Sequence, residues 1–287
     1  MSGGFSFVKM QGAGNDFVLV DALKKPVKIG AGLARDLCDR RFGVGADQIL
    51  LLEPSKKADF KMRVMNPDGS EVEMCGNGIR CAALYAFETG RVKKKEMAVE
   101  TLAGLIRPSL QGKGRVRVDM GEPVLEAEAI PTTGRGRVID HDFSFSPPSF
   151  GRAGERVGSV NLEITAVSMG NPHCVVFVDD LDKTPVEDWG PVIETHPFFP
   201  KRVNVEFVQV KGPDAARVRV WERGAGITLA CGTGACAVGV AGVLTGRFHR
   251  KVDLDLPGGT LAIEWAPDNH VFMTGPAAFV FNGIYKG

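Results

Sequence analysis

Two cysteines in this sequence stand in the same short glycine-rich motif. Cys75 begins the tetrapeptide CGNG, and Cys231 begins the tetrapeptide CGTG. Each motif runs into a stretch of small, apolar residues that ends on the tripeptide TGR, at residues 89–91 and 245–247. A duplicated cysteine in a duplicated setting indicates a duplicated chemical group. Two such thiols can act as a proton donor and a proton acceptor.

The two motifs belong to an internal repeat with an offset of 156 residues, which carries Cys75 onto Cys231. The matched positions are cysteines, glycines and hydrogen-bonding side chains, which a generic apolar pattern does not explain. A period this long excludes a solenoid and predicts two homologous halves. The alternative is a duplication that serves folding alone. The polar matches are Asn15 with Asn171, Gln48 with Asn204, and Asn66 with Glu222.

Length and composition are those of an ordinary two-domain globular protein. The chain has 287 residues, of which 44% are hydrophobic and 24% are charged. A net charge of +1 gives no reason to expect nucleic acid or an anionic membrane as a partner. Residues 224–246 carry no charge, but they are too rich in glycine and alanine for a membrane span, so we expect a buried helix there. The six cysteines show no disulfide framework, which favours a reducing, cytoplasmic setting.

The apolar periodicity predicts mostly strands, with one conspicuous helix in each half. The helices cover residues 76–89 and 232–245, and a lesser helix covers residues 32–41. Residues 203–206, Val-Asn-Val-Glu, alternate as a half-buried antiparallel strand should. Residues 132–158, rich in Gly, Pro, Ser and Arg, predict an exposed linker and hairpin region between the halves. Strands are predicted at 17–20, 48–52, 60–65, 115–120, 174–178, 203–210, 217–221 and 252–256.

Both cysteines of the repeat fall at the predicted amino terminus of a helix. The first N–H groups of a helix have no partner within it, and the helix macrodipole places about half a positive charge there. This setting stabilises a thiolate, so we expect each thiol pKa to fall from about 8.5 toward neutrality. The same N–H groups can bind a carboxylate, and the glycines of the motifs allow a ligand to approach the backbone closely.

Two such helix ends, meeting across a pseudo-two-fold axis, would place one thiol on each face of a bound molecule. One thiol could remove a proton from a carbon atom while the other returns a proton to the opposite face. The stereochemistry of that carbon would be inverted. Water has to be excluded, because a carbanion beside a carboxylate needs preorganised donors.

Other roles for the cysteines fit the sequence less well. Cys75 with Cys81, and Cys231 with Cys236, lack the C-x₂-C spacing of metal-binding pairs, and no matched histidines follow. No metal is therefore expected, and the four other cysteines are expected to be small buried hydrophobes. No lysine lies within either motif to hold pyridoxal phosphate, so no cofactor is expected.

Several motifs together resemble the diaminopimelate epimerase family over nearly the whole chain. Any one of them is weak alone, whereas the set is specific. The motifs are GAGNDF (12–17), RFGVGADQ (41–48), NPDGS (66–70), MCGNGIRC (74–81), GNPH (170–173), VNV (203–205), WERG (221–224) and ACGTG (230–234).

The resemblance implies a cofactor-independent, homodimeric enzyme that interconverts LL- and meso-2,6-diaminoheptanedioate on the lysine pathway. It also implies an α/β (α+β) fold of two pseudo-symmetric lobes. Each lobe is expected to be a mostly antiparallel, barrel-like sheet wrapped around a central helix, with the active site in the cleft between the lobes. We place the N-terminal lobe at residues 1–131, with residues 277–287 returning to it, and the C-terminal lobe at residues 132–276.

The resemblance further assigns roles to individual residues. Cys75 and Cys231 are the acid and the base, which exchange roles with the hand of the substrate, and their pKa values are tuned by His173 and Glu222. Glu222 and Arg223 meet the distal, non-reacting centre, where Arg can clamp a carboxylate and Glu can receive an ammonium group. The carboxylate at the reacting centre is cradled by Gly76, Asn77, Gly232 and Thr233. The substrate-contacting amides are Asn15, Gln48, Asn66, Asn171 and Asn204. Arg80, one turn after Cys75, is left out of the site as a residue of the helix surface.

Three other functions remain open at this point. A proline or hydroxyproline racemase also pairs two cysteines, but Glu222 and Arg223 favour a longer substrate with a second charged end. An isomerase of the phenazine-biosynthesis type shares the fold and lacks the cysteine pair. A non-catalytic amino-acid-binding protein could use the same helix ends and amides. Exchange of the α-hydrogen for solvent deuterium distinguishes an epimerase from such a binding protein.

Overall fold

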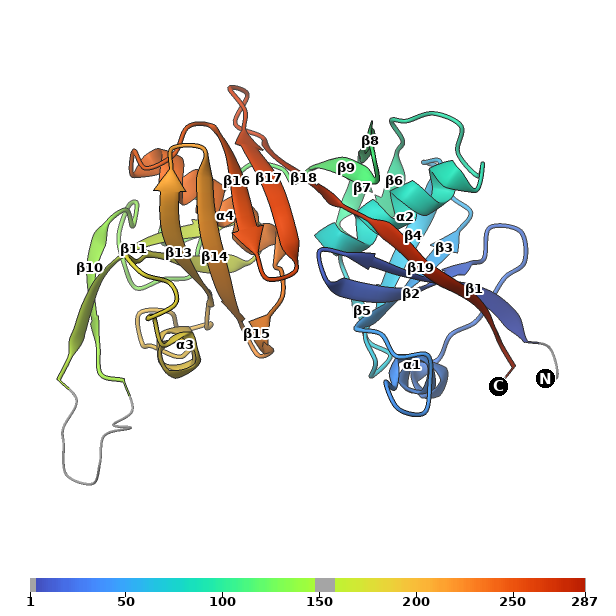
Figure 1. Ribbon diagram of the computed structural model, residues 1–287, viewed down its shortest axis with the longest axis horizontal. Coiled ribbons are helices and arrows are strands. Elements are labelled where there is room, and N and C mark those ends of the chain that lie inside the picture. The colour runs from blue at the N-terminus through green and yellow to red at the C-terminus, as the bar shows by residue number, and fades with distance from the viewer. Residues whose placement is uncertain (1–3, 148–157, 287) are drawn as a thin grey trace. The chain divides into compact units, whose positions relative to one another are not determined.

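The computed structural model describes residues 4–147 and 158–286 and divides the chain into two compact units (Figure 1). Unit 1 comprises Met1–Asp119 and Thr274–Gly287, and unit 2 comprises Met120–Met273. Residues 120–131 lie with unit 2 because Val124 exchanges two backbone hydrogen bonds with Ser168 of that unit.

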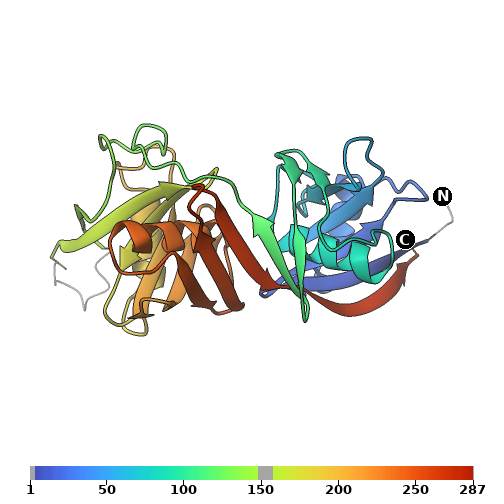
Figure 2. The ribbon, with the colours of Figure 1, turned by 90° about the horizontal axis from the view of Figure 1, so that it is seen from above.

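Unit 1 contains an eight-stranded sheet in the order β19-β1-β2-β3-β4-β6-β7, with β5 beside β4. The carboxyl-terminal strand β19, in red, pairs antiparallel with β1, in blue (Figure 1 and Figure 2). The helices of unit 1 are α1 (Ala31–Cys38) and α2 (Gly76–Glu88). Its strands are β1 (Phe5–Gly12), β2 (Asn15–Asp21), β3 (Gln48–Glu53), β4 (Phe60–Met65), β5 (Glu71–Val72), β6 (Val99–Thr101), β7 (Gly104–Ile106), the hairpin of β8 (Ser109–Gly112) and β9 (Arg115–Asp119), and β19 (Ala278–Tyr285).

Unit 2 contains a sheet whose strand order begins β10-β11-β12-β13-β14-β16-β17-β18, with β15 beside β14. Its helices are α3 (Val186–Glu194) and α4 (Gly232–Leu244). Its strands are β10 (His141–Phe145), β11 (Val160–Ser168), β12 (Pro172–Phe177), β13 (Asn204–Gly212), β14 (Ala215–Glu222), β15 (Gly226–Thr228), β16 (Lys251–Leu256) and β17 (Gly259–Trp265), and β18 (Val271–Pro276) begins in unit 2 and ends in unit 1.

The two sheets share one strand order, which confirms the predicted duplication. Strands β1 to β4 correspond to β11 to β14, and β6 and β7 correspond to β16 and β17. The register follows the same offset of 156 residues. Phe17 lies opposite Gln48 in the parallel pair β2–β3, as His173 lies opposite Asn204 in the parallel pair β12–β13. Equivalent residues of the repeat therefore occupy equivalent places in the two units.

Most neighbouring strands run antiparallel, as expected. Among the strand pairs whose register is described, the exceptions are the parallel pairs β2–β3 and β4–β6 in unit 1 and β12–β13 and β14–β16 in unit 2. Among the described residues both sheets are open, and neither closes into a barrel. The barrel-like sheets expected from the sequence therefore describe the fold only loosely.

Alternation along the strands of unit 1 sends side chains to two faces of the sheet. Ile49 and Leu51 pack in a core cluster with Leu37 of α1. The alternate residues Phe17 and Leu50 face α2, because a Cβ atom placed on Gly78 of α2 would lie 2.9 Å from Leu50 Cδ2 and 3.5 Å from Phe17 Cε1. The sheet therefore lies between the two helices of its unit.

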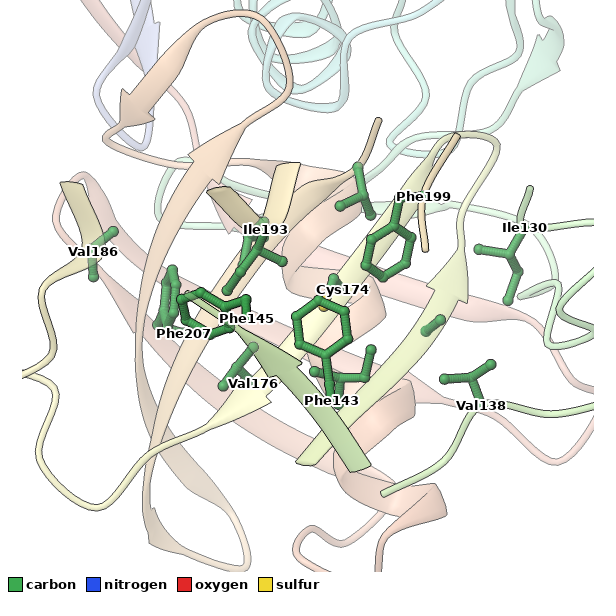
Figure 3. Close-up of a cluster of buried hydrophobic side chains, with 14 of the residues drawn as sticks. Ile130, Val138, Phe143, Phe145, Cys174, Val176, Val186, Ile193, Phe199 and Phe207 are labelled. Carbon is green, nitrogen blue, oxygen red and sulfur yellow. The ribbon is translucent and has the colours of Figure 1, made fainter. Parts of the chain in front are cut away.

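Unit 2 repeats this arrangement with α3 on one face and α4 on the other. The cluster on the α3 side gathers Phe143, Phe145, Cys174 and Phe207 (Figure 3). Ile193 of α3 packs into the same cluster (Figure 3). The alternate positions on β12 and β13 consequently face α4.

Helix α4 can be surrounded by protein because its side chains are small. In α4 nine of the residues are buried, including Gly234, Gly239 and Gly242. A Cβ atom on Gly239 would lie 2.6 Å from Cγ2 of Ile263, and one on Gly242 would overlap the ring of Phe248. Because both positions are glycine, Ile263 of strand β17 and the ring of Phe248, in the loop after α4, can approach the helix backbone directly.

The sequence located α1, α2, α4 and the predicted strands to within a few residues, but it missed α3. That helix contains Pro191, a residue that normally ends helices. Strand β10 agrees in part with the expected exposed linker and hairpin region, since it pairs antiparallel with β11 and three of its five residues are exposed. Its aromatic side chains are not exposed, because Phe143 and Phe145 are 4% and 3% exposed. Residues 148–157 of that stretch lie outside the described residues. The expectation that residues 203–206 form a half-buried strand is also wrong. Asn204 and Glu206 are 4% and 0% exposed, so β13 is covered on both faces.

Within the described ranges, no helix is both long enough and apolar enough to cross a membrane.

We expect Gly242→Ala to lower the free energy of unfolding by about 1–3 kcal/mol, because the added methyl group overpacks the contact with Phe248. The matched control is Gly32→Ala in α1, where a Cβ atom meets nothing within 4 Å. The control should be neutral or stabilising by up to about 1 kcal/mol through helix propensity. Urea denaturation of both variants measures the difference. Equal stability of the two variants would contradict this packing account.

Candidate active site

The unit 1 half of the candidate site is built on the first turn of α2. Cys75 is the N-cap residue of the helix, and its Sγ accepts a hydrogen bond from the Gly78 N–H at 3.4 Å. The Cys75 side chain is partly exposed, whereas Asn77 is 4% exposed. The helix start thus holds a sulfur atom at the point where the macrodipole favours negative charge.

Asn15 joins the thiol to the helix end. Its Oδ1 lies 3.7 Å from Cys75 Sγ and accepts a hydrogen bond from Asn77 Nδ2 at 3.4 Å. Its Nδ2 donates to Asp47 Oδ2 at 2.7 Å. A carboxylate can only accept, so Asp47 determines which end of the Asn15 amide faces the thiol. The amide presents its oxygen.

Arg80 lies inside this half-site, which corrects its assignment to the helix surface. The residue is completely buried. Its guanidinium donates to Asn77 Oδ1 at 2.8 Å, to the Gly76 carbonyl at 3.1 Å and to the Pro276 carbonyl at 3.1 Å. Arg80 therefore orients Asn77 and adds a positive charge beneath the first turn of α2. The signal in the sequence that could have identified Arg80 as part of the half-site is that it is a lone basic residue in an otherwise uncharged helix interior.

Gln48 and Asn66 form a second amide pair in unit 1. Gln48 Nε2 donates to Asn66 Oδ1 at 2.9 Å, and Asn66 Nδ2 donates to Ser70 Oγ at 3.0 Å. Gln48 opens β3 and Asn66 follows the last residue of β4. Both side chains are partly exposed, which leaves surface for a ligand.

The unit 2 half-site repeats the helix cap. Cys231 is the N-cap residue of α4, and its Sγ accepts a hydrogen bond from the Gly234 N–H at 3.4 Å. Thr233 Oγ1 lies 3.4 Å from the same sulfur. In contrast to Cys75, Cys231 is 8% exposed.

The environment of Cys231 favours the protonated thiol. Burial raises its pKa well above the usual value, and the negative charges of Glu222 and Glu206 raise it further. Hydrogen bonds from Thr233 and Gly234 oppose this shift without reversing it. The sequence-based expectation of a lowered pKa is therefore wrong for Cys231, because burial and two nearby carboxylates outweigh the helix end.

His173 sits in a buried chain of polar groups on β12 and β13. Its Nδ1 lies 2.7 Å from Glu206 Oε1, and its Nε2 lies 3.0 Å from Asn171 Oδ1. Both His173 and Glu206 are fully buried. The sequence motif identified His173 and Asn171, but it gave Glu206 no role, because alternation along the strand suggested that this carboxylate faces solvent.

The remaining predicted residues of unit 2 gather at the end of β14. Asn204 Nδ2 donates to the Pro172 carbonyl at 2.8 Å, and its Oδ1 accepts from the Arg223 backbone N–H at 2.9 Å. The exposed Arg223 guanidinium donates to the Lys201 carbonyl at 3.2 Å. Glu222 Oε1 accepts from Thr228 Oγ1 at 2.5 Å. Asn204 thus ties the Glu222–Arg223 pair to the start of β12.

Each unit consequently assembles its own set of predicted residues. Unit 1 brings together Cys75, Asn15 and Asn77, and it pairs Gln48 with Asn66. Unit 2 brings Thr233 to Cys231, and Asn171 to His173. In the part of the chain that the structure describes, no group of three or more His, Cys, Asp or Glu residues could hold a metal ion.

We expect iodoacetamide to modify Cys75 at least about tenfold faster than Cys231 near neutral pH, because alkylation needs an accessible thiolate. Cys231 is buried and its raised pKa keeps it protonated, so its reaction should accelerate only as the pH rises above the range in which ordinary thiols ionise. Peptide mass spectrometry of the native protein measures both rates. Cys81, whose pKa burial raises to about 12, serves as the unreactive control. Faster labelling of Cys231 would contradict this difference between the half-sites.

Comparisons with known proteins agree with the motifs over the whole chain. A sequence model of the diaminopimelate epimerase family matches residues 7–126 and 165–280. A curated diaminopimelate epimerase from Moorella thermoacetica is 55% identical over 286 residues, which cover 97% of this chain and 98% of the relative. A curated diaminopimelate epimerase from Synechocystis sp. is 50% identical over 288 residues, with 97% and 98% coverage.

Solved structures with much lower identity have the same fold. A phenazine biosynthesis protein of the PhzF family from Bacillus anthracis is 16% identical, covers 99% of both chains and gives a TM-score of 0.69. A hydroxyproline epimerase from Agrobacterium vitis is 17% identical, covers 98% of this chain and 91% of its own, and gives a TM-score of 0.66. At these identities the likeness concerns the fold alone. The sequence matches do show the family: the chain belongs to the diaminopimelate epimerase family.

Proposed function

We propose that the chain interconverts LL- and meso-2,6-diaminoheptanedioate without a cofactor, with Cys75 and Cys231 acting on opposite faces of one α-carbon. The observation that carries the proposal is the duplicated helix cap. Each sulfur accepts a backbone N–H at 3.4 Å at the start of a helix of 13 residues. Membership of the diaminopimelate epimerase family supports the substrate, and with it a place in lysine biosynthesis.

The proton path follows from the difference between the two thiols. The raised pKa of Cys231 supports its role as the acid that starts the reaction protonated. The Cys75 thiolate removes the α-hydrogen as a proton, and the electron pair of the C–H bond stays on the α-carbon, stabilised by the adjacent carboxylate. Cys231 then gives its proton to the opposite face and becomes the thiolate. No electrons are gained or lost, and substrate of the other hand reverses the two roles.

The helix ends supply the donors that this intermediate needs. Backbone N–H groups of the first turns, at Gly76, Asn77, Gly232 and Thr233, bind the carboxylate of the reacting centre. Arg80 beneath the first turn of α2 strengthens that positive field, since it donates to both Gly76 and Asn77. The amides of Asn15, Gln48, Asn66, Asn171 and Asn204 hold the charged groups of the amino acid.

The distal end of the substrate meets Glu222 and Arg223. A guanidinium can bind a carboxylate through two parallel hydrogen bonds, and a carboxylate can receive the distal ammonium group. Glu222 then has two effects, because its charge also raises the pKa of Cys231. A substrate with a second charged end uses this pair, and proline does not.

We further propose a homodimer in a reducing, cytoplasmic compartment. Reactive thiols require reducing conditions. The edge strand β19 supports the dimer, because Phe279, Phe281 and Ile284 on it are 42%, 47% and 70% exposed. Sedimentation of the protein at micromolar concentration should give twice the chain mass of 30.8 kDa. A single species at the chain mass would exclude the dimer.

We expect Cys75→Ala and Cys231→Ala each to lower kcat for diaminoheptanedioate epimerisation by at least about 10²- to 10⁴-fold, because each removes one proton-transfer group. Both variants should remain folded. The assay follows the LL-to-meso ratio by chiral chromatography, without added pyridoxal phosphate or metal.

Cys38→Ala is the matched control, because Cys38 is a buried cysteine of α1 that packs in the core. It should keep wild-type turnover. L-Proline and trans-4-hydroxy-L-proline serve as alternative substrates and should show no inversion. Substantial turnover by either active-site variant, or faster inversion of proline than of diaminoheptanedioate, would overturn the proposal.

A further inference from the structure

Glu194 is a buried carboxylate of unit 2 that the proton path does not use. It is the last residue of helix α3 and is 5% exposed. Its Oε2 accepts a hydrogen bond from Trp221 Nε1 at 2.8 Å, and its Oε1 accepts one from the Gly224 N–H at 3.0 Å. An indole N–H and a backbone N–H can only donate, so the carboxylate is the acceptor in both bonds. Glu194 thus binds the first and the last residue of the WERG motif.

Helix α3 also packs directly on the side chain of Trp221. A Cβ atom on Gly190 would lie 2.5 Å from Trp221 Cγ and 2.6 Å from Trp221 Cδ2, so the indole leaves no room for a side chain there. Gly190 and Glu194 are four residues apart and therefore lie on the same face of the helix. This face of α3 meets the ring of Trp221 with bare backbone and the indole N–H with a carboxylate.

The turn that Glu194 binds needs contacts from outside it to have a defined shape. The turn after β14 contains Gly224 and Gly226, whose φ angles are +76° and +80°. Glycine loses more conformational freedom on ordering than any other residue. Two of the contacts that offset this cost reach the backbone from other elements. One is the carboxylate of Glu194 on the Gly224 N–H, and the other is Asn204 Oδ1, which accepts from the Arg223 N–H at 2.9 Å.

The repeat shows that the fold does not by itself require a carboxylate at this place. The offset of 156 residues carries Cys38, the last residue of α1, onto Glu194, and it carries Met65 onto Trp221. Cys38 and Met65 belong to one apolar core cluster of unit 1. Burial of a carboxylate costs free energy that apolar residues do not cost. Unit 2 therefore has polar contacts to its turn at a place where unit 1 has apolar packing.

We propose that Glu194 is a positioning residue that holds the turn at residues 221–224 and thereby presents Glu222 and Arg223 to the distal end of the substrate. Groups that are held in place before binding lose less freedom when the ligand arrives, so the ligand binds more tightly. Recognition of a second charged end then depends on helix α3 as well as on the charged pair itself. The inference deepens the proposed function and rests on it for the activity measurements only.

The first test measures hydrogen exchange of the two N–H groups that Glu194 binds, and it needs no turnover. The indole N–H of Trp221 and the backbone N–H of Gly224 should both exchange slowly in the wild type, although Gly224 is an exposed residue. Glu194→Met removes both acceptors, so both groups should exchange at least about tenfold faster. Glu194→Gln keeps one oxygen and should release at least one of the two groups. ¹⁵N NMR of the labelled protein measures the rates.

The chain offers a matched indole as an internal control. Trp265 Nε1 donates to Asn269 Oδ1 at 3.1 Å in another turn of unit 2, and its exchange rate should be the same in all three proteins. Fast exchange of either group bound by Glu194 in the wild type, or unchanged exchange in Glu194→Met, would overturn the proposal. Acceleration of the Trp265 indole by the same factor would reveal a general loss of stability and would equally contradict a local role.

The second test is the KM for LL-2,6-diaminoheptanedioate. Glu194→Gln should raise KM by about 10- to 100-fold, the effect of a slightly misplaced binding group, and should lower kcat by a smaller factor. The turn binds the end of the substrate that does not react, so its displacement weakens binding more than it slows proton transfer. Glu187→Gln is the matched control, because Glu187 is an exposed carboxylate in the first turn of the same helix, and it should keep the wild-type KM.

This split between KM and kcat distinguishes positioning from a purely structural role. A variant that is partly unfolded has fewer active molecules, which lowers the apparent kcat and leaves KM unchanged. Such a result for Glu194→Gln would contradict the proposal.

The third test combines Glu194→Gln with Arg223→Ala. Glu194→Gln should raise KM by a smaller factor in the Arg223→Ala background than in the wild type, because part of what Glu194 positions is already absent. Equal factors in the two backgrounds would show that Glu194 acts independently of Arg223 and would overturn the proposal. Inactivity of the wild type toward diaminoheptanedioate refutes the proposed function instead, and the exchange rates then still decide whether Glu194 holds the turn.

Discussion

The hydrogen bond from the third residue of a helix to the sulfur of its N-cap cysteine is the constraint on which the rest of the structure depends. The donors are the N–H groups of Gly78 and Gly234. Each glycine is also closely packed, since a Cβ atom would lie 2.9 Å from Leu50 Cδ2 in one unit and 2.5 Å from Glu206 Oε1 in the other, and these side chains would have to move. The strands behind each helix are thus packed against bare backbone. A helix held this closely keeps its first turn, and therefore its sulfur, in a defined place.

Because of the repeat, the two units share one backbone arrangement, but they differ in the charged side chains near their helix caps. Arg80 places a buried cation beneath the first turn of α2, where α4 has Cys236 at the equivalent position. Near Cys231 the extra charges are the carboxylates of Glu206 and Glu222, which raise its thiol pKa. Duplication therefore supplies two thiols in similar helix caps, and substitution around them gives the two thiols different electrostatic surroundings.

The sequence predicted the features that follow from local pattern and missed those that depend on tertiary context. The N-caps at Cys75 and Cys231 and both long helices follow from glycine motifs and helix stops. Helix α3 was missed because Pro191 normally argues against a helix. Glu206 was read as solvent-facing because alternation cannot reveal that a second helix covers the other face of the sheet. The raised pKa of Cys231 was missed for the same reason, since burial and neighbouring charges come from distant strands.

The central claim is that two different sulfur atoms handle the proton on opposite faces of one carbon. The most direct measurement is the reaction of LL-2,6-diaminoheptanedioate in heavy water, stopped at low conversion, with deuterium counted separately in product and recovered substrate. Two thiols predict meso product that carries deuterium at the inverted centre and recovered LL substrate that carries none. Product that retains the hydrogen of the substrate, or deuterium that enters both pools equally, would point to a single base and contradict the account.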